Sequence, residues 1–106
     1  MRGPRRWYYG NMKIIAISRD MPDGPEASSA MLRDEAATVW RLQTQGVIRQ
    51  IWFTTDTHDA VIEMECSDAG EAARALAELP LVAARVIRFD LLPLRAYDGF
   101  TRLFAS

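Results

Sequence analysis

Cysteine and histidine are nearly absent from this sequence of 106 residues, which contains one of each. A single cysteine excludes a disulfide bond within the chain and suits the reducing conditions of the cytoplasm, where we expect the protein to be located. Cys66 lies on the apolar side of a segment that alternates like a strand. We expect its thiol to be buried and unreactive, since a reactive thiol needs exposure and a positive neighbour.

The chain also lacks an excess of charge of either sign, with 13 basic and 14 acidic residues and a net charge of −1. Such a surface has little attraction for nucleic acid or an anionic membrane. The apolar run at 12–18 is too short for a membrane span or a secretion signal and meets Arg19 and Asp20 at once. Residues 1–11 are basic and aromatic but form one short arm, so we expect a flexible extension rather than an RNA-binding element.

Several motifs with well-understood chemistry are missing from the sequence. It contains no GxSxG, no glycine-rich phosphate loop, no CxxC and no HExxH. Nucleotide cofactors and metal-dependent hydrolysis therefore have no support. We expect a protein that works without a cofactor or a metal ion.

What the chain does have is enough apolar sequence for one compact domain with a modest core, since 49% of its residues are hydrophobic. We place this domain at 12–106, with an aromatic tail at 95–106. Alternating segments predict strands, and spacings of three and four residues predict helices. The predicted elements are a strand at 13–18, a helix from 25 or 26 to 45, strands at 47–55 and 60–66, a helix at 67–79 that Pro80 ends, and a strand at 85–92.

The order βαββαβ defines an α+β chain and is typical of the ferredoxin-like arrangement, in which a four-stranded antiparallel sheet carries two helices on one face. Strand residues alternate between the two faces. The side chains expected beneath the helices are Ala60, Ile62, Met64, Cys66, Ile87, Phe89 and Leu91. Glu63, Glu65, Arg88 and Asp90 are then expected on the face that the helices leave open.

Two glutamates on one face of the segment 60–66 suggest acid–base chemistry. Glu63 and Glu65 would lie roughly 7 Å apart along the strand. Two negative charges at that distance repel by about 0.6 kcal/mol in water and about 2.4 kcal/mol at an effective dielectric constant near 20. An enclosed pair could supply one acid and one base. Alternatively, Arg49 and Arg88 on neighbouring strands would form ion pairs with both carboxylates and leave an ordinary salt-bridged face.

The strand at 47–55 is apolar on both sides, which a fully solvated sheet face does not require. Ile51 and Phe53 are predicted on one side, and Ile48 and Trp52 on the other. A second copy of the sheet is the usual cover for such a face. We therefore expect a homodimer, or an assembly of dimers, with a half-polar cavity between the sheets.

His58 lies in the predicted turn between two strands, with Asp56 and Asp59 as neighbours. These three residues can be imagined as a metal site, but a strong metal signal needs three or four spaced ligands, and a single histidine in a turn is usually only solvated. Trp52 and Trp40 could line a pocket for a planar ligand, although a tryptophan on a helix is more often part of the core.

The segment EAARALAELPLVAARVIRFDLLPL, residues 71–94, resembles the second helix, the Leu-Pro-Leu turn and the final strand of the muconolactone isomerase family in the dimeric α/β barrel superfamily. The preceding LQTQGVIRQIWFTTDTHDAVIEMEC is also similar, and together they cover most of 13–94. The resemblance implies a ferredoxin-like homodimer and a pocket for a small-molecule substrate. It also implies a cofactor-independent shift of a double bond in an unsaturated lactone, in bacterial breakdown of aromatic compounds.

On the matching positions, the resemblance implies Glu63 or Glu65 as the catalytic base. Arg49 or Arg88 would hold a substrate carboxylate. The tail does not match that enzyme; related barrels use such tails to reach across the dimer, which would bring Tyr97 to a neighbouring subunit.

Three hypotheses follow from the sequence. The first is a cofactor-independent isomerase or lyase of small lactones or organic acids. The second is cofactor-free oxidation of an aromatic substrate, in which Trp52, His58 and Tyr97 would matter more than the glutamates. The third is a non-catalytic ligand-binding or assembly module whose open face is a dimer interface.

Overall fold

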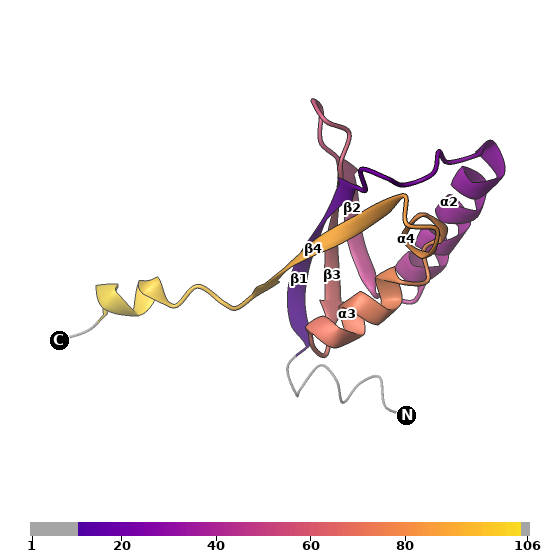
Figure 1. Cartoon of the computed structure of the whole chain (residues 1–106). Helices are drawn as coiled ribbons and strands as arrows, with labels where there is room; N and C mark the ends of the chain where they lie inside the picture. The colour runs from indigo at the N-terminus through magenta and orange to yellow at the C-terminus, as the bar shows by residue number, and fades with distance from the viewer. Residues whose placement is uncertain (1–10, 105–106) are drawn as a thin grey trace.

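The computed structural model describes residues 11–104, and the chain forms an antiparallel four-stranded sheet with helices packed on one face (Figure 1). The strand order is β2-β3-β1-β4. This confirms the expected α+β class and is compatible with a ferredoxin-like fold. The strands are β1 (Met12–Asp20), β2 (Ile48–Phe53), β3 (Ala60–Cys66) and β4 (Ile87–Leu94). The helices are α2 (Ser29–Thr44), α3 (Ala69–Leu76), α4 (Pro80–Ala83) and a 3₁₀ turn, η1 (Gly99–Leu103).

α2 and α3 begin where a side chain accepts a hydrogen bond from one of the first backbone N–H groups. The Ser28 hydroxyl accepts a bond from the N–H of Met31 at 3.1 Å, so α2 begins later than the predicted 25 or 26. The Asp68 carboxylate accepts a bond from the N–H of Glu71 at 2.8 Å and caps α3. Gly46 follows α2 with a φ of +83°, a conformation that favours glycine and ends the helix.

The prediction of two helices was wrong by one short element. α3 ends at Leu76, and Pro80 does not end that helix but occupies the first turn of a separate helix, α4. Proline suits this position because its fixed φ is helical and the first helical N–H needs no partner within the helix. The extra turn lets α4 pack against α2.

The core lies between the sheet and the helices, as the alternation predicted. Its buried side chains are Ile14, Ala16, Leu42, Ile48, Ile62, Met64, Cys66, Ala72, Ala75, Leu76 and Leu79. Cys66 is 1% exposed, which confirms the expected buried thiol. Ile87, Phe89 and Leu91 are partly buried in the same layer.

β2 departs from strict alternation because its pairing with β3 shifts register between Ile48 and Gln50. A bulge of this kind adds one residue and reverses which side chains face inward beyond it. Ile48 therefore packs in the core together with Ile51, while Trp52 is half exposed. The prediction that Ile48 and Trp52 share a face was wrong for this reason.

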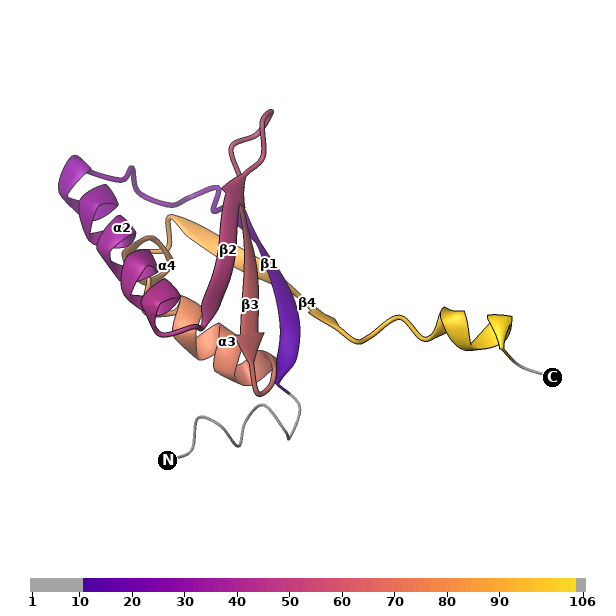
Figure 2. The same ribbon diagram turned by 180° about the vertical axis from the view of Figure 1, so that it is seen from behind.

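The described part of the C-terminal tail leaves β4 and runs away from the body of the protein, ending in η1 (Figure 2). Its side chains Tyr97 and Phe100 are 72% and 65% exposed and contact each other edge to face. The expected flexible extension at 1–11 falls almost entirely outside the described residues. Within those residues, no helix is both long enough and apolar enough to cross a membrane.

Candidate functional site

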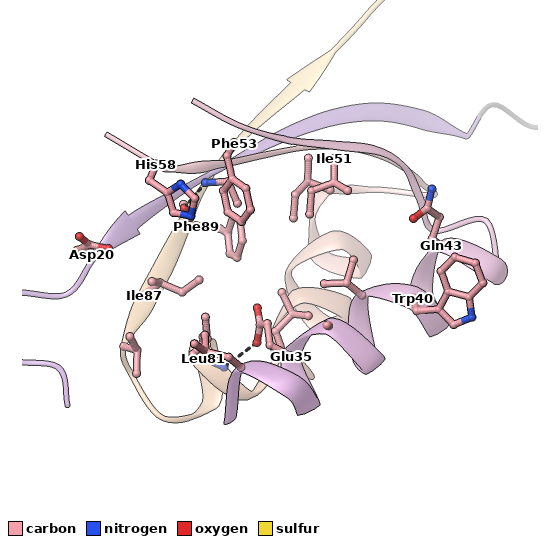
Figure 3. A pocket seen from close by; sticks show the side chains of 18 residues that line it. Asp20, Glu35, Trp40, Gln43, Ile51, Phe53, His58, Leu81, Ile87 and Phe89 are labelled. Atoms are coloured by element: carbon pink, nitrogen blue, oxygen red, sulfur yellow. Dashed lines mark hydrogen bonds between the residues drawn. The ribbon is translucent and has the colours of Figure 1, made fainter. Parts of the chain in front are cut away.

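A cavity of about 510 Å³ lies between the sheet and α2, on the face that the helices cover (Figure 3). Most of its wall is apolar, with side chains from β2, β4, α2 and the segment at 79–86. The sequence predicted a site on the opposite, open face, at Glu63 and Glu65. The described pocket is therefore separated from those carboxylates by the sheet itself.

The cavity exists because α2 fills the space above the sheet only near its C-terminal end, where Leu42 is buried. Toward the N-terminus of α2, the smaller Ala36 and Val39 line the cavity, while Leu32 and Trp40 are 51% and 68% exposed. Small side chains at the layer interface leave a gap that larger ones would close. The expectation of Trp40 as a core residue was wrong, and its position fits the alternative of a tryptophan lining a pocket.

Glu35 is the most distinctive polar group of the cavity. One carboxyl oxygen accepts a hydrogen bond from the N–H of Leu81 at 2.9 Å. Figure 3 shows the carboxyl group between α2 and the cavity space. Burial raises the pKa of Glu35 above its ordinary value, and the hydrogen bond from Leu81 opposes the rise. A half-buried carboxyl group whose pKa is raised holds a proton more readily and acts as a stronger base.

Sequence reasoning missed Glu35, although a signal was present. Leu32, Ala36 and Val39 lie three residues before, one after and four after Glu35, so all four belong to one side of the helix. Burying a carboxylate within an apolar helical stripe costs free energy unless a hydrogen-bonding or charged partner compensates it. The hydrogen bond to Leu81 provides a structural partner and at the same time fixes the direction of the carboxyl group.

We expect Glu35→Gln to stabilise the fold at neutral pH. Because the folded chain holds the Glu35 proton more tightly, the stability that this residue contributes is fully present below about its ordinary pKa of 4.5 and is lost as the pH rises through the raised pKa. Glutamine keeps the acceptor for Leu81 without the charge. Urea unfolding at pH 7.5 and pH 4 should show a more stable variant only at pH 7.5. An equal difference at both pH values would contradict the prediction.

His58 reaches the cavity from the hairpin turn between β2 and β3, where the sequence placed it. Its ring stacks on Phe53 with centroids 4.0 Å apart. The residue has a φ of +57°, in the left-handed region that histidine tolerates better than most residues. Around it, the Asp59 N–H donates to the Thr54 hydroxyl at 2.8 Å and the Thr57 hydroxyl donates to Asp59 at 2.7 Å. The turn is thus held in one shape, with the imidazole at the cavity.

Asp20, Ser18 and Gln43 complete the polar part of the wall. Ser18 is 5% exposed, and its hydroxyl accepts a hydrogen bond from the N–H of Ala60 at 2.7 Å, so it has a structural role. Asp20 is exposed at the end of β1. Among the residues that the structure describes, no three histidine, cysteine or acidic side chains gather into a group that could hold a metal ion.

Glu63 and Glu65 lie on the open face, as predicted, but their principal partner was not foreseen. The Lys13 ammonium lies 2.7 Å from Glu63 and 3.6 Å from Glu65. The hydrogen bond to Glu63 raises the pKa of Lys13, against the effect of partial burial. Arg49 reaches Glu65 at 3.9 Å, whereas Arg88 pairs with Asp90 instead. A cation between the two carboxylates removes the repulsion on which the acid–base interpretation depended.

The remaining predicted site residues do not gather in one place. Arg88 shares Asp90 with Arg19, and hydrogen bonds from Arg19 and Arg88 hold the pKa of Asp90 below its ordinary value. Trp52 lies on the open face and is 50% exposed, while Tyr97 belongs to the tail. Of the residues that the sequence suggested for a substrate pocket, His58 and Trp40 line the cavity, whereas Arg49, Arg88, Trp52 and Tyr97 do not.

Comparison of the chain with models of known protein families and with curated proteins finds no match.

Proposed function

We propose that this protein is a cofactor-independent isomerase that moves a proton within a small unsaturated lactone or organic acid. The observation that carries the proposal is Glu35, a half-buried carboxyl group with a raised pKa at the wall of an apolar cavity. Pockets of several hundred cubic ångströms with apolar walls and a few convergent polar groups are typical of small-molecule sites. Burial makes the carboxylate a stronger base than it would be in water.

In the proposed reaction, the ionised Glu35 takes a proton from a carbon next to the double bond of the substrate. The electron pair shifts into the conjugated system and places negative charge on the carbonyl oxygen. The protonated Glu35 then returns the proton to another carbon of that system. No oxidant, reductant or leaving group is needed, because one C–H bond breaks and another forms, and Glu35 returns to its ionised form.

We expect His58, which lines the cavity from the hairpin turn, to assist this step. An imidazole N–H donates a hydrogen bond, and the carbonyl oxygen of the substrate is where negative charge develops. The stacking of His58 on Phe53 keeps the ring at the cavity wall. This proposal moves the base from Glu63 or Glu65 to Glu35, since the former two contact Lys13 on the other side of the sheet.

We also propose that a second copy of the chain covers the open face. Trp52, Leu92 and Leu94 on this face are 50%, 48% and 44% exposed. The clusters around Lys13 and Arg19 contain charges of both signs, so a second copy brings no excess of like charge. Exposed apolar area with balanced charges favours a symmetric dimer.

Of the two alternative functions, only cofactor-free oxidation finds less support in the geometry. Cofactor-free oxidation was linked to Trp52, His58 and Tyr97, which lie on the open face, at the cavity and in the tail. A non-catalytic ligand-binding module fits the cavity equally well, and turnover separates it from the isomerase.

Proton transfer can be measured directly in D₂O by NMR. We expect the protein to exchange hydrogen and move the double bond in α-angelica lactone, or in its carboxylate-bearing analogue muconolactone, at least about 100-fold faster than buffer at the same pH. The same protein unfolded in urea serves as the control. If neither lactone exchanges faster than in buffer while both bind, the ligand-binding module replaces the isomerase.

A further inference from the structure

The charged groups of the cavity are all acidic or imidazole. Asp20, Glu35 and His58 are its ionisable side chains, and no lysine or arginine of the described residues lines the wall. Glu35 is already partly removed from water, and burial is what raises its pKa. A second carboxylate brought beside it would lose hydration without gaining a cationic partner.

Three cations of the strands, Lys13, Arg19 and Arg49, are paired on the open face. Lys13 lies with Glu63, and Arg49 is within 3.9 Å of Glu65. Arg19 lies with Asp59 and Asp90 at 3.7 and 3.1 Å. These pairs involve side chains of the open face, so the sheet separates them from the cavity. The arginine that would recognise a substrate carboxylate is therefore missing from the described wall.

The apolar part of the wall shows what the cavity can hold. Leu32, Trp40 and Phe53 are 51%, 68% and 59% exposed, and all three line the cavity. Aromatic faces favour contact with other flat rings. An uncharged ring in the cavity would remove apolar area from water, and its carbonyl or amide group would give the carboxyl group of Glu35 an uncharged hydrogen-bonding partner. Figure 3 shows Glu35 and Phe53 among the side chains that line the cavity.

We infer that the cavity selects an uncharged, flat ring compound that carries a carbonyl or amide group, and discriminates against carboxylates of the same shape. This inference narrows the substrate class of the proposed isomerase and rests on the same cavity. It favours neutral lactones over the organic acids that the proposed function also includes. It differs from the sequence-based expectation that Arg49 or Arg88 holds a substrate carboxylate.

Two nearly isosteric probes test the charge preference without requiring turnover. We would titrate the full chain at pH 7.5 with 2-naphthamide and with 2-naphthoate, following backbone amide signals by NMR. We expect the amide to bind at least tenfold more tightly and to shift the signals of Ala36, Val39 and Phe53. Ala36→Trp, which fills the cavity, should remove these shifts for the amide. Glu35→Gln should reduce the preference severalfold by strengthening binding of the naphthoate.

The outcomes separate this inference from the proposed function. Equal or tighter binding of the naphthoate in the cavity overturns the inference and leaves proton transfer possible. A preference for the amide in a protein that fails the D₂O assay supports the inference and overturns the isomerase. Binding of neither probe, or shifts confined to Trp52 and the open face, overturns the inference. Ala36→Trp is checked by circular dichroism, and an Ala36→Leu variant replaces it if the tryptophan variant does not fold.

Discussion

Replacing Glu35 by glutamine is expected to reduce proton exchange in the lactone assay by about 10²- to 10⁴-fold, the usual contribution of a general acid–base group. Glutamine retains the oxygen that accepts the N–H of Leu81, so the local packing is preserved. What the variant loses is the ability to take and return a proton. The measurement is the initial rate of deuterium incorporation by NMR at pH 7.5, with the fold monitored by circular dichroism.

The matched control for this variant is Glu63→Gln, which also replaces one carboxyl group by an amide. Glu63 lies on the open face and pairs with Lys13 at 2.7 Å, so we expect its exchange rate to stay within about threefold of the parent. The opposite pattern, with Glu63→Gln inactive and Glu35→Gln active, would return the reaction to the open face. Similar large losses in both variants would indicate that the two sides of the sheet work together.

Ile14→Ala is expected to lower the free energy of unfolding by about 2–5 kcal/mol. Ile14 is 0% exposed and lies in β1, a central strand of the sheet, opposite Met64. The substitution removes three buried carbon atoms and leaves a void that the neighbouring strands and helices cannot fill without moving. Urea unfolding followed by circular dichroism measures the loss.

Ile15→Ala is the control, because Ile15 is the next residue of β1 and points to the open face between Glu63 and Leu92. In a monomer, Ile15→Ala should lower the free energy of unfolding by well under half as much as Ile14→Ala. In the proposed dimer Ile15 becomes buried, so the loss of unfolding free energy caused by Ile15→Ala should rise with protein concentration. The variant should also dissociate more readily in analytical ultracentrifugation. A monomeric parent at high concentration would contradict the dimer, and equal costs for both variants in that monomer would contradict the assignment of the faces.

Several features of the fold were predictable because they depend on short-range rules. Alternation in β3 correctly assigned Met64 and Cys66 to the core and Glu63 to the open face. Other features depend on pairing between strands. The bulge in β2 moved Ile48 to the side of Ile51, and only the hydrogen-bonding register with β3 reveals it.

The candidate site was less predictable than the fold. His58 was identified as a candidate from its uniqueness and its turn, but its contact with the cavity depends on stacking with Phe53. Glu35 lies on the side of α2 that carries Leu32, Ala36 and Val39, but periodicity alone does not show that this side borders a cavity. Arg49 and Arg88 were paired with the glutamates only because strand alternation places them on the same face. The structure shows instead that the ammonium group of Lys13 lies closest to Glu63, at 2.7 Å.

By itself, the sequence determined the α+β class, the order of strands and long helices, the buried side of β3 and the location of His58 in a turn. These properties follow from side-chain periodicity, caps and turn residues, which act over a few neighbouring positions. Only the tertiary structure decided that the pocket lies under α2 rather than on the open face. A cavity is the space that packed layers fail to fill, so its position depends on residues far apart in the chain, such as Glu35 and His58.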